Sequence, residues 1–374
     1  MAGSSSSMPL GVYIHIPFCL KRCPYCSFFS VASLDRTLFT RYRDALIYEI
    51  EHFPTSVEID TIYFGGGTPS IFPVEFLSDI LSAVSTRFKL LPGAEITLEA
   101  NPHTLDKRSL RLLLSSGFNR ISIGAQSFSD RVLSLLGRVH SADEAEESFL
   151  MAREAGFDNI SLDIIYGIQA QTTDELLLTL DKLVSLSPEH ISTYALTLED
   201  GCVSGLCPAS SEKSCGMYHR IVRCLVDAGY SHYEVSNFAR EGFFSRHNLK
   251  YWNQEEYIGF GASASSYFSG RRWRNSASIE NYIAGCPPVV DILSKEKIKD
   301  EFFLLRLRKT DGFSTNEFEQ FFGEDIADFL AIPRIQELAG SGYLAFEDGR
   351  LFIPGEHLFV SDEIIVEVAS SFFP

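Results

Sequence analysis

Short apolar runs typical of β-strands recur along the first half of the chain and alternate with segments of helical periodicity. Helical spacing is clear in 38–53, 73–88 and 141–156, the last with Ser141 and Glu144 placed as in a capping box. Each interval between strands has room for a crossover helix, so the pattern predicts β/α units in succession. The expected fold is α/β, with a parallel sheet curved into a partial (β/α)6 barrel. The six predicted strands are 11–16, 59–64, 94–100, 119–125, 159–167 and 190–196.

The pattern changes after about residue 201. Helical spacing at 217–230 precedes a predicted strand at 231–239, which would extend the sheet edge. The stretch 246–275 is rich in aromatic residues and glycine and predicts an irregular segment that lines a site. Three further helices and a small hairpin are predicted beyond it. The expected regions are a flexible tail at 1–10, a barrel at 11–240, a lining segment and linker at 241–296, and a helical, winged-helix-like domain at 297–374.

Composition and charge restrict the function classes. The 374-residue chain is 45% hydrophobic and 22% charged, as in globular proteins that bury a core. Its formal net charge of −17 disfavours nucleic acid and anionic lipid as partners, because both need a basic surface. No apolar run reaches the ~18 residues of a membrane span, and the N-terminal residues lack a signal or transit pattern. Eight cysteines form no dense disulfide framework, so we expect a cytoplasmic protein with reduced thiols.

Polar or glycine-rich groups follow the predicted strands. A cysteine cluster comes after the first strand, FGGGTPS (64–70) after the second, and Glu99, Gln126 and Asp163 at the ends of the next three. In parallel β/α folds the carboxyl ends of the strands share one rim, where ligands bind. Turn or helix-cap chemistry explains any one of these groups alone. Their agreement predicts a binding rim.

The cysteine cluster consists of Cys19, Cys23 and Cys26. Thiolates are soft ligands that suit zinc or iron–sulfur centres. A structural zinc site needs four ligands, and His15 is a candidate for the fourth, although its place in a strand favours packing. Three thiolates on a [4Fe–4S] cube instead leave one iron open to an amine and a carboxylate. Spacing favours the cube and leaves zinc and free or redox-active thiols open.

Three consecutive glycines follow the second strand. Gly66 and Gly67 lack a Cβ, so their backbone, with that of Thr68, allows close approach to an amine or carboxylate near the open iron. A tight turn that binds no ligand explains the three glycines equally well. The stretch is not a P-loop, because no Gly-Lys-Ser/Thr follows.

Carboxylates and one arginine complete the predicted rim. Glu99 and Asp163 suit hydrogen bonds to ribose hydroxyls or to an ammonium group, with a helix cap as the alternative. Gln126 and Arg138 are close enough in sequence to reach the rim together, and Arg138 suits a ligand carboxylate. A surface position is the default for an isolated arginine.

The last notable stretch is HNLKYW (247–252). A histidine beside tyrosine and tryptophan is a candidate iron ligand, and flat aromatic rings suit the face of a macrocycle. A hydrogen-bonded loop histidine is the more common case. His247 is therefore only a candidate ligand on residue type.

The C-x-x-x-C-x-x-C spacing resembles that of the radical S-adenosylmethionine (SAM) superfamily. It is accompanied by an ordered series of motifs: YIHIPFC, CPYC, FGGGTPS, LEANP, GAQSF, LGRVH, LDIIYG and HNLKYW. The ordered series is similar to the oxygen-independent coproporphyrinogen oxidases, in particular to their HemW haem-chaperone branch, over nearly the whole chain. The resemblance implies a [4Fe–4S] cluster on Cys19, Cys23 and Cys26, and haem on His247. The SAM contacts that it implies are Tyr13, Tyr25, Gly66, Gly67, Thr68, Glu99, Gln126, Arg138 and Asp163.

Two departures separate the chain from the decarboxylating oxidases that it resembles. Those proteins carry a fourth cysteine two residues after the third, where this chain has Phe28, and a longer N-terminal segment. The expected function is therefore a haem chaperone that hands haem to an acceptor protein not identified by the sequence. The alternatives are SAM-dependent oxidative decarboxylation of coproporphyrinogen III to protoporphyrinogen IX, and an unrelated structural zinc protein.

Overall fold

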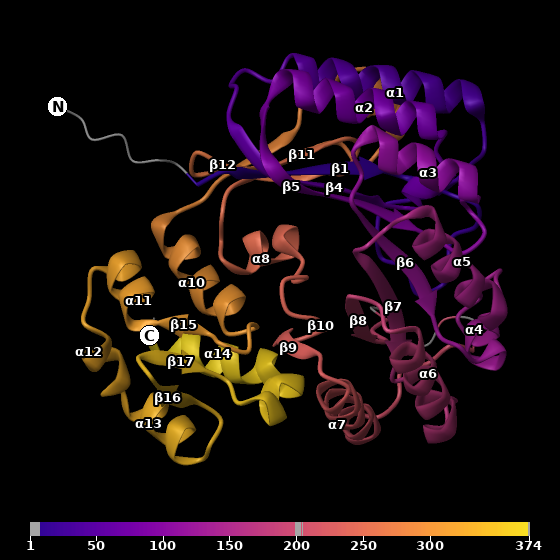
Figure 1. Ribbon diagram of the computed structural model, residues 1–374. Helices are drawn as coiled ribbons and strands as arrows, with labels where there is room; N and C mark the ends of the chain where they lie inside the picture. Colours follow the sequence, from indigo (N-terminus) through magenta and orange to yellow (C-terminus); the bar gives the residue numbers. More distant parts are fainter. Residues whose placement is uncertain (1–7, 199–202, 204, 373–374) are drawn as a thin grey trace.

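The computed structural model describes residues 8–198, 203 and 205–372, and a curved sheet dominates it (Figure 1). The predicted tail at 1–10 lies mostly outside the described residues, and the first strand already begins at Leu10. The strands of the sheet are β1 (Leu10–Ile16), β4 (Glu58–Gly66), β5 (Lys89–Ala100), β6 (Arg120–Gln126), β7 (Ile160–Tyr166), β8 (His190–Ala195), β9 (Ser231–Glu234), β10 (Asn237–Ala239), β11 (Tyr257–Phe260), β12 (Ser265–Phe268), β13 (Arg271–Arg274) and β14 (Val289–Ile292).

The strands follow the order β14-β13-β12-β11-β1-β4-β5-β6-β7-β8-β10-β9. From β11 to β8 all neighbouring strands are parallel, and the outer strands on both sides pair antiparallel. Each of the six predicted strands is present, and 231–239 extends the sheet edge as predicted, although it splits into β9 and β10. The sheet remains open at β14 and β9. The fold is therefore a partial barrel of the radical SAM type, as predicted.

Helices cover the outer face of the sheet. They are α1 (Arg36–Glu51), α2 (Val74–Arg87), α3 (Lys107–Ser116), α4 (Asp130–Leu135), α5 (Ala142–Ala155) and α6 (Thr173–Leu186), with α7 (Ser211–Asp227) beside the last strands. In α5 the predicted capping box of Ser141 and Glu144 is present, and Gly156 ends the helix in a left-handed conformation. Figure 1 shows α1, α2 and α3 on one face of the sheet, opposite to α8 (Arg246–Trp252).

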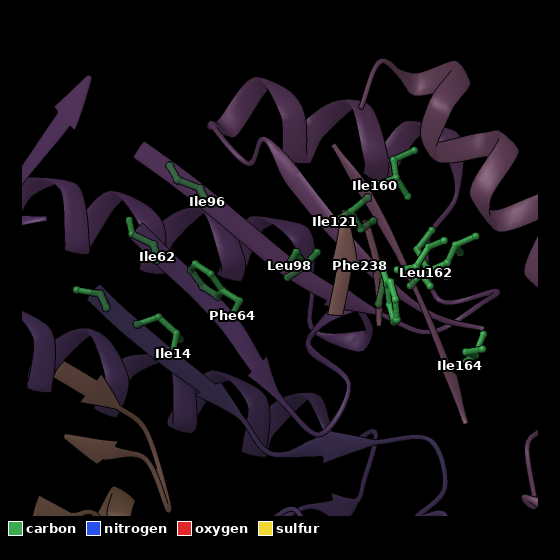
Figure 2. Packing of buried hydrophobic residues seen from close by; sticks show 14 of the residues in the cluster. Ile14, Ile62, Phe64, Ile96, Leu98, Ile121, Ile160, Leu162, Ile164 and Phe238 are labelled. Carbon is green, nitrogen blue, oxygen red and sulfur yellow. The ribbon is translucent and has the colours of Figure 1, made fainter. Parts of the chain in front are cut away.

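Alternation along the strands separates two environments. Ile14, Phe64, Leu98 and Leu162 point outward and pack against the helices, each fully buried (Figure 2). Their sequence neighbours point to the inner face and are largely polar, because successive side chains of a strand lie on opposite sides. The apolar outer layer holds the fold together and leaves the inner face for polar groups.

The stretch 246–275 differs from its prediction. It is not irregular: it forms α8 and then β11, β12 and β13, which continue the sheet beyond β1. Aromatic residues and glycines obscure the alternation of these short strands, which explains the error. Beyond this stretch, α9 (Ile279–Ile283) packs near α1.

The C-terminal region contains more structure than three helices and a hairpin. Its helices are α10 (Lys295–Arg306), α11 (Thr315–Phe322), α12 (Ile326–Leu330), α13 (Pro333–Gly340) and α14 (Ser361–Phe372). Strands β15 (Phe313–Ser314), β16 (Ala345–Glu347) and β17 (Arg350–Phe352) form a small antiparallel sheet with β17 in the middle. The core of this region is built from phenylalanines, among which Phe302 packs edge to face against Phe313 and Phe318.

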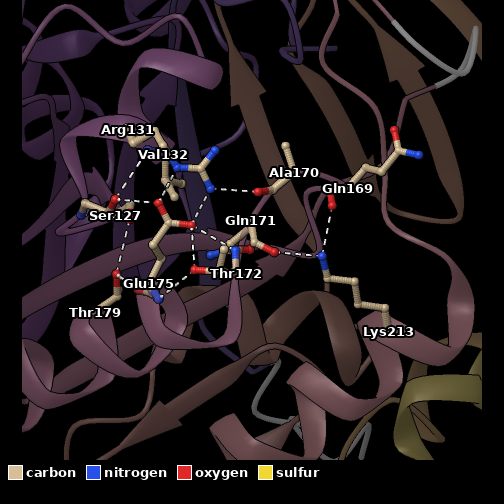
Figure 3. A network of polar contacts seen from close by, with 11 residues as sticks. Ser127, Arg131, Val132, Gln169, Ala170, Gln171, Thr172, Glu175, Thr179 and Lys213 are labelled. Carbon is tan, nitrogen blue, oxygen red and sulfur yellow. Dashed lines mark hydrogen bonds and ion pairs between the residues drawn. The ribbon is translucent and has the colours of Figure 1, made fainter.

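A polar network fixes the loop after β7 (Figure 3). Arg131 of α4 donates to both carboxylate oxygens of Glu175 and to the carbonyl of Ala170. Lys213 of α7 donates to the carbonyls of Gln169 and Gln171 at 2.9 and 2.7 Å. The bond from Arg131 lowers the pKa of Glu175 to about 2. The network therefore ties α4, α6 and α7 to the end of one central strand.

Across the described part of the chain, no helix combines the length and apolar character that crossing a bilayer demands.

The turn after β11 depends on Gly261, whose φ is +102°. Tyr42 of α1 donates its hydroxyl hydrogen to the carbonyl of His15 and accepts from the amide of Ala262, both at 2.8 Å. A Cβ on Gly261 would lie 2.6 Å from the His15 carbonyl oxygen and 2.7 Å from the Tyr42 hydroxyl. This glycine therefore permits β1, α1 and β11 to meet.

We expect Gly261→Ala to lower the free energy of unfolding by about 2–5 kcal/mol, because left-handed strain adds to overpacking. Gly270→Ala is the matched control, since Gly270 has a φ of +70° and open space around its Cβ position. The control should lose only about 1–2 kcal/mol. Equilibrium urea unfolding measures both, and equal losses would contradict the role given to the turn.

Candidate functional site

The three cysteines lie on the loop that leaves β1. Cys19 ends the two-residue strand β2 (Phe18–Cys19), which pairs with β3 (Val31–Ala32), and a turn joins the Cys26 amide to the Cys23 carbonyl at 3.1 Å. All three are free thiols, with Cys19 buried and the other two half-buried. Burial raises the pKa of Cys26, and the neighbouring Cys19 and Cys23 raise it further. The loop thus keeps the three sulfur atoms within reach of one another.

The three thiols of the loop suit a [4Fe–4S] cube, in which each thiolate binds a different iron. Within the described residues, no group of three or more His, Cys, Asp or Glu side chains is arranged to hold a single metal ion. The Arg138 guanidinium donates to the Cys23 sulfur at 3.4 Å, which places a cation beside the loop.

The glycine loop packs against the cysteine loop. The Gly67 amide donates to the Ile16 carbonyl at 2.9 Å, and the Thr68 amide to the Phe18 carbonyl at 2.8 Å. A Cβ on Gly67 would lie 2.7 Å from the Phe18 carbonyl oxygen and 3.0 Å from the Cys19 sulfur. The sequence left a ligand and a tight turn as equal explanations of the glycines, and in the structure Gly67 is in close contact with the cysteine loop itself.

A chain of hydrogen bonds connects the two loops to the next strands. Thr68 donates its hydroxyl hydrogen to the Cys19 sulfur at 3.6 Å and accepts from the Asn101 side chain at 2.9 Å. Arg138 in turn donates to the Asn101 side-chain oxygen and to the Gly124 carbonyl, and its other nitrogen lies 3.4 Å from the Tyr25 hydroxyl. The structure therefore brings Thr68, Tyr25 and Arg138 together with the cysteines.

Asn101 was missed by the sequence analysis, although it joins Thr68 to Arg138. It belongs to the motif LEANP, two residues beyond Glu99, and its position just after a strand end was the available signal. Gln126, which was predicted, ends β6 with a φ of 65°, an uncommon conformation for a residue other than glycine. Such strain occurs often at functional sites.

Glu99 lies on the inner face of β5 and does not cap a helix. It accepts hydrogen bonds from the Tyr63 hydroxyl at 2.9 Å and from the Gly66 amide at 3.2 Å. Burial raises its pKa to about 7, although the Tyr63 hydrogen bond opposes the shift. Tyr13 stacks on Tyr63, with ring centroids 6.3 Å apart. Glu99 is thus a buried carboxyl group at the glycine loop, with a pKa raised to about 7.

Asp163 lies on the inner face of β7. Its two oxygens accept from the Ser122 hydroxyl at 3.1 and 3.0 Å, and one accepts from Ser161 at 3.2 Å. Burial raises its pKa, while these hydrogen bonds and the positive charge of Arg120 oppose the rise. Arg120, which the sequence analysis also missed, is only 2% exposed and supplies this charge from the beginning of β6. Its signal was an arginine at the beginning of an otherwise small and apolar strand.

His247 lies apart from the cysteine loop, in α8 and not in an irregular segment. Its ring is hydrogen bonded on both sides, to the Thr61 hydroxyl at 2.9 Å and to the Tyr251 hydroxyl at 2.8 Å. Burial lowers its pKa to about 3. Glu95 accepts from the backbone amide of His247 at 3.1 Å, which anchors the helix to the inner face. Iron ligation by His247 stays a prediction, and it requires these ring contacts to open.

A pocket of about 370 Å³ adjoins the cysteine loop. Strands β1 and β11 to β13, the end of α8 and Leu305 of α10 form its walls, so the predicted lining segment does contribute to it. Phe28 lines it and is 66% exposed. We call it the aromatic pocket after the tyrosines and phenylalanines on its wall, Tyr13, Phe28, Phe29, Tyr251, Tyr257 and Tyr267.

Comparison with known proteins agrees with this arrangement. Residues 13–183 match the radical SAM superfamily, and 293–358 match the HemN C-terminal domain. The heme chaperone HemW of Lactococcus lactis is 36% identical, with 86% of this chain and 89% of the relative covered. HemW of Escherichia coli is 32% identical, with 92% and 96% covered. The chain belongs to the HemW family of radical SAM proteins. Membership implies a [4Fe–4S] cluster and SAM as cofactors.

The fold also matches a solved structure along nearly its whole length. Coproporphyrinogen III oxidase (HemN) from Escherichia coli, described as a radical SAM enzyme, superposes with a TM-score of 0.84. The match covers 99% of this chain and 91% of that chain at 22% identity. At this identity the likeness concerns the fold alone.

Replacing any of Cys19, Cys23 or Cys26 by Ala should abolish the iron–sulfur cluster, because a cube with two thiolate ligands loses a required bond. Cys224→Ala is the control, since that thiol lies in α7 away from the loop. Iron and sulfide analysis after anaerobic reconstitution should find about four irons per parent chain and per control chain. Stoichiometric zinc without iron in the parent would contradict the assignment.

The raised pKa of Glu99 makes stability depend on pH. Unfolding releases its proton between about 4.5 and about 7, so the free energy of unfolding should fall as pH rises through this window. Glu99→Gln removes the titration. The free energy of unfolding of the parent should therefore fall relative to that of this variant between pH 4.5 and 7, and the difference should stay constant above pH 7. Urea unfolding of cluster-free protein measures it. Parallel profiles of the two proteins would refute the environment described for Glu99.

Proposed function

We propose that the protein is a haem chaperone of the cytoplasm, which binds haem and transfers it to an acceptor protein. The observation that carries this proposal is the aromatic pocket beside the cysteine loop, where Phe28 occupies the position of a fourth thiol. A planar apolar macrocycle gains most from flat aromatic walls, which bury it with little loss of side-chain freedom. The relatives named heme chaperone HemW support the same function.

The cluster and SAM belong to this proposal as companions of the haem site. Cys19, Cys23 and Cys26 would hold the cluster, which supplies one iron open to the amino and carboxylate groups of SAM. Arg138 is placed to meet the SAM carboxylate. Glu99 and Asp163 would accept hydrogen bonds, and remaining contacts would come from Tyr13, Tyr25, Gly66, Gly67, Thr68 and Gln126. We also retain the division into a barrel at 11–240 and a helical domain from 297 as a proposal.

The role proposed for His247 is indirect in the arrangement of the structure. It does not line the aromatic pocket, whereas its hydrogen-bond partner Tyr251 does. Direct iron ligation would require the ring to leave Thr61 and Tyr251. In the arrangement of the structure, His247 would instead act on a bound haem through the orientation of the Tyr251 ring.

The chaperone and oxidase functions predict different outcomes with one preparation. Reconstituted protein should bind haem with a Soret band and pass it to an added apo-haemoprotein. It should not convert coproporphyrinogen III when SAM and a reductant are present, because the thiol at position 28 is absent. Sustained production of protoporphyrinogen IX would reverse the choice between the two functions.

Two substitutions separate ligation by His247 from an indirect role. Tyr251→Phe removes the hydrogen bond and retains the imidazole, whereas His247→Gln removes the imidazole and retains a polar group. If His247 binds the iron, only His247→Gln should remove the spectral bands of an imidazole ligand. If it orients Tyr251, both variants should shift the Soret band alike and neither should lose a ligand. Cluster content should remain that of the parent in both, because the cysteines lie elsewhere.

A further inference from the structure

The aromatic pocket contains positive charge as well as aromatic surface. Arg272 and Arg274 of β13 both line it, two residues apart and therefore on the same face of the strand. Their partners across the strand pair are Tyr267 and Ser265 of β12, which also line the pocket. Two guanidinium groups thus lie at one side of a cavity whose wall is rich in aromatic rings, in a chain whose net charge is −17.

The charged side chains around the pocket differ in whether they form an ion pair. Arg272 forms a two-pronged ion pair with Glu301 of α10, at 2.6 and 2.9 Å. Glu255, the carboxylate on the pocket wall, pairs with Lys250 at 3.0 Å. Both of these charges are neutralised by a partner.

Arg274 differs from its neighbour. Within the described residues its guanidinium donates to the carbonyl and hydroxyl oxygens of Ser263, at 3.3 and 2.7 Å, and both acceptors are neutral. Its positive charge therefore has no carboxylate partner among the described side chains. A guanidinium presents several donors in one plane and binds a carboxylate through two parallel hydrogen bonds.

We propose that Arg274 binds a carboxylate of the ligand in the aromatic pocket, with Arg272 as a second, weaker contact. This inference rests on the proposed haem function and adds how the macrocycle is oriented. Haem carries two propionate groups at one edge, so the charged edge would face β13 while the apolar edge faces Phe28 and the cysteine loop. Arg272 contributes less because Glu301 already neutralises it.

The test measures binding of haemin and of haemin dimethyl ester, which lacks the carboxylates, by Soret titration of the full-length protein. The parent should prefer haemin over the ester by about ten- to a hundredfold, the value of a charge-assisted hydrogen bond. Arg274→Gln should lose most of this preference while its affinity for the ester stays that of the parent. Arg272→Gln should lose less. Glu301→Gln should bind haemin more tightly, because Arg272 is then free.

Arg271→Gln is the matched control. Arg271 lies on the same strand, is exposed and does not line the pocket, so its replacement removes the same charge elsewhere. The control should bind both ligands as the parent does. Equal haemin affinities in Arg274→Gln and Arg271→Gln, or equal binding of haemin and ester by the parent, would overturn this inference and leave the haem function standing. Failure of the parent to bind either ligand would instead refute the proposed function.

Discussion

The alternation of side chains along parallel strands is the constraint on which the rest of the structure depends. One set of residues on β1, β4, β5, β6 and β7 faces the helices and forms the apolar core. The other set must then face the inner side, where the curved sheet and α8 enclose it. Buried polar groups are costly unless they are hydrogen bonded, and on the inner face Glu99 is paired with Tyr63 and Asp163 with Ser122. The outer layer therefore holds the barrel together by apolar packing, and the inner layer gathers its polar side chains.

The same constraint explains why α8 is buried. Its N-terminal amides meet the carboxylate of Glu95 on the inner face of β5, and Lys250 pairs with Asp60 at 3.0 Å near the beginning of β4. His247 fills the remaining space between Thr61 and Tyr251. A motif that sequence reasoning linked to haem thus closes the inner face of the barrel. Its effect on a ligand in the aromatic pocket would pass through Tyr251, which belongs to both.

Much of the barrel was predictable because its strands and helices are long and regular. The capping box at Ser141 and the strand-end positions of Glu99 and Gln126 follow from local sequence, and the structure contains them, whereas Asp163 lies in the middle of β7. The helix and strands within 246–275 were not predictable, since short strands give too few alternating positions. Asn101 and Arg120 were missed for a different reason. Their importance depends on contacts across neighbouring strands, which spacing along the chain does not reveal.

Our central claim is that the buried carboxyl groups of the inner face serve ligand binding at a cost in stability. The most direct test is the thermal midpoint of cluster-loaded protein at pH 8, with and without SAM, for the parent and Glu99→Gln. A ligand at about 100 times its Kd adds about 2.7 kcal/mol of stability. We predict that the variant unfolds at a higher temperature than the parent without SAM and gains less when SAM is added. A variant that is less stable than the parent without SAM and gains equally from it would contradict the account.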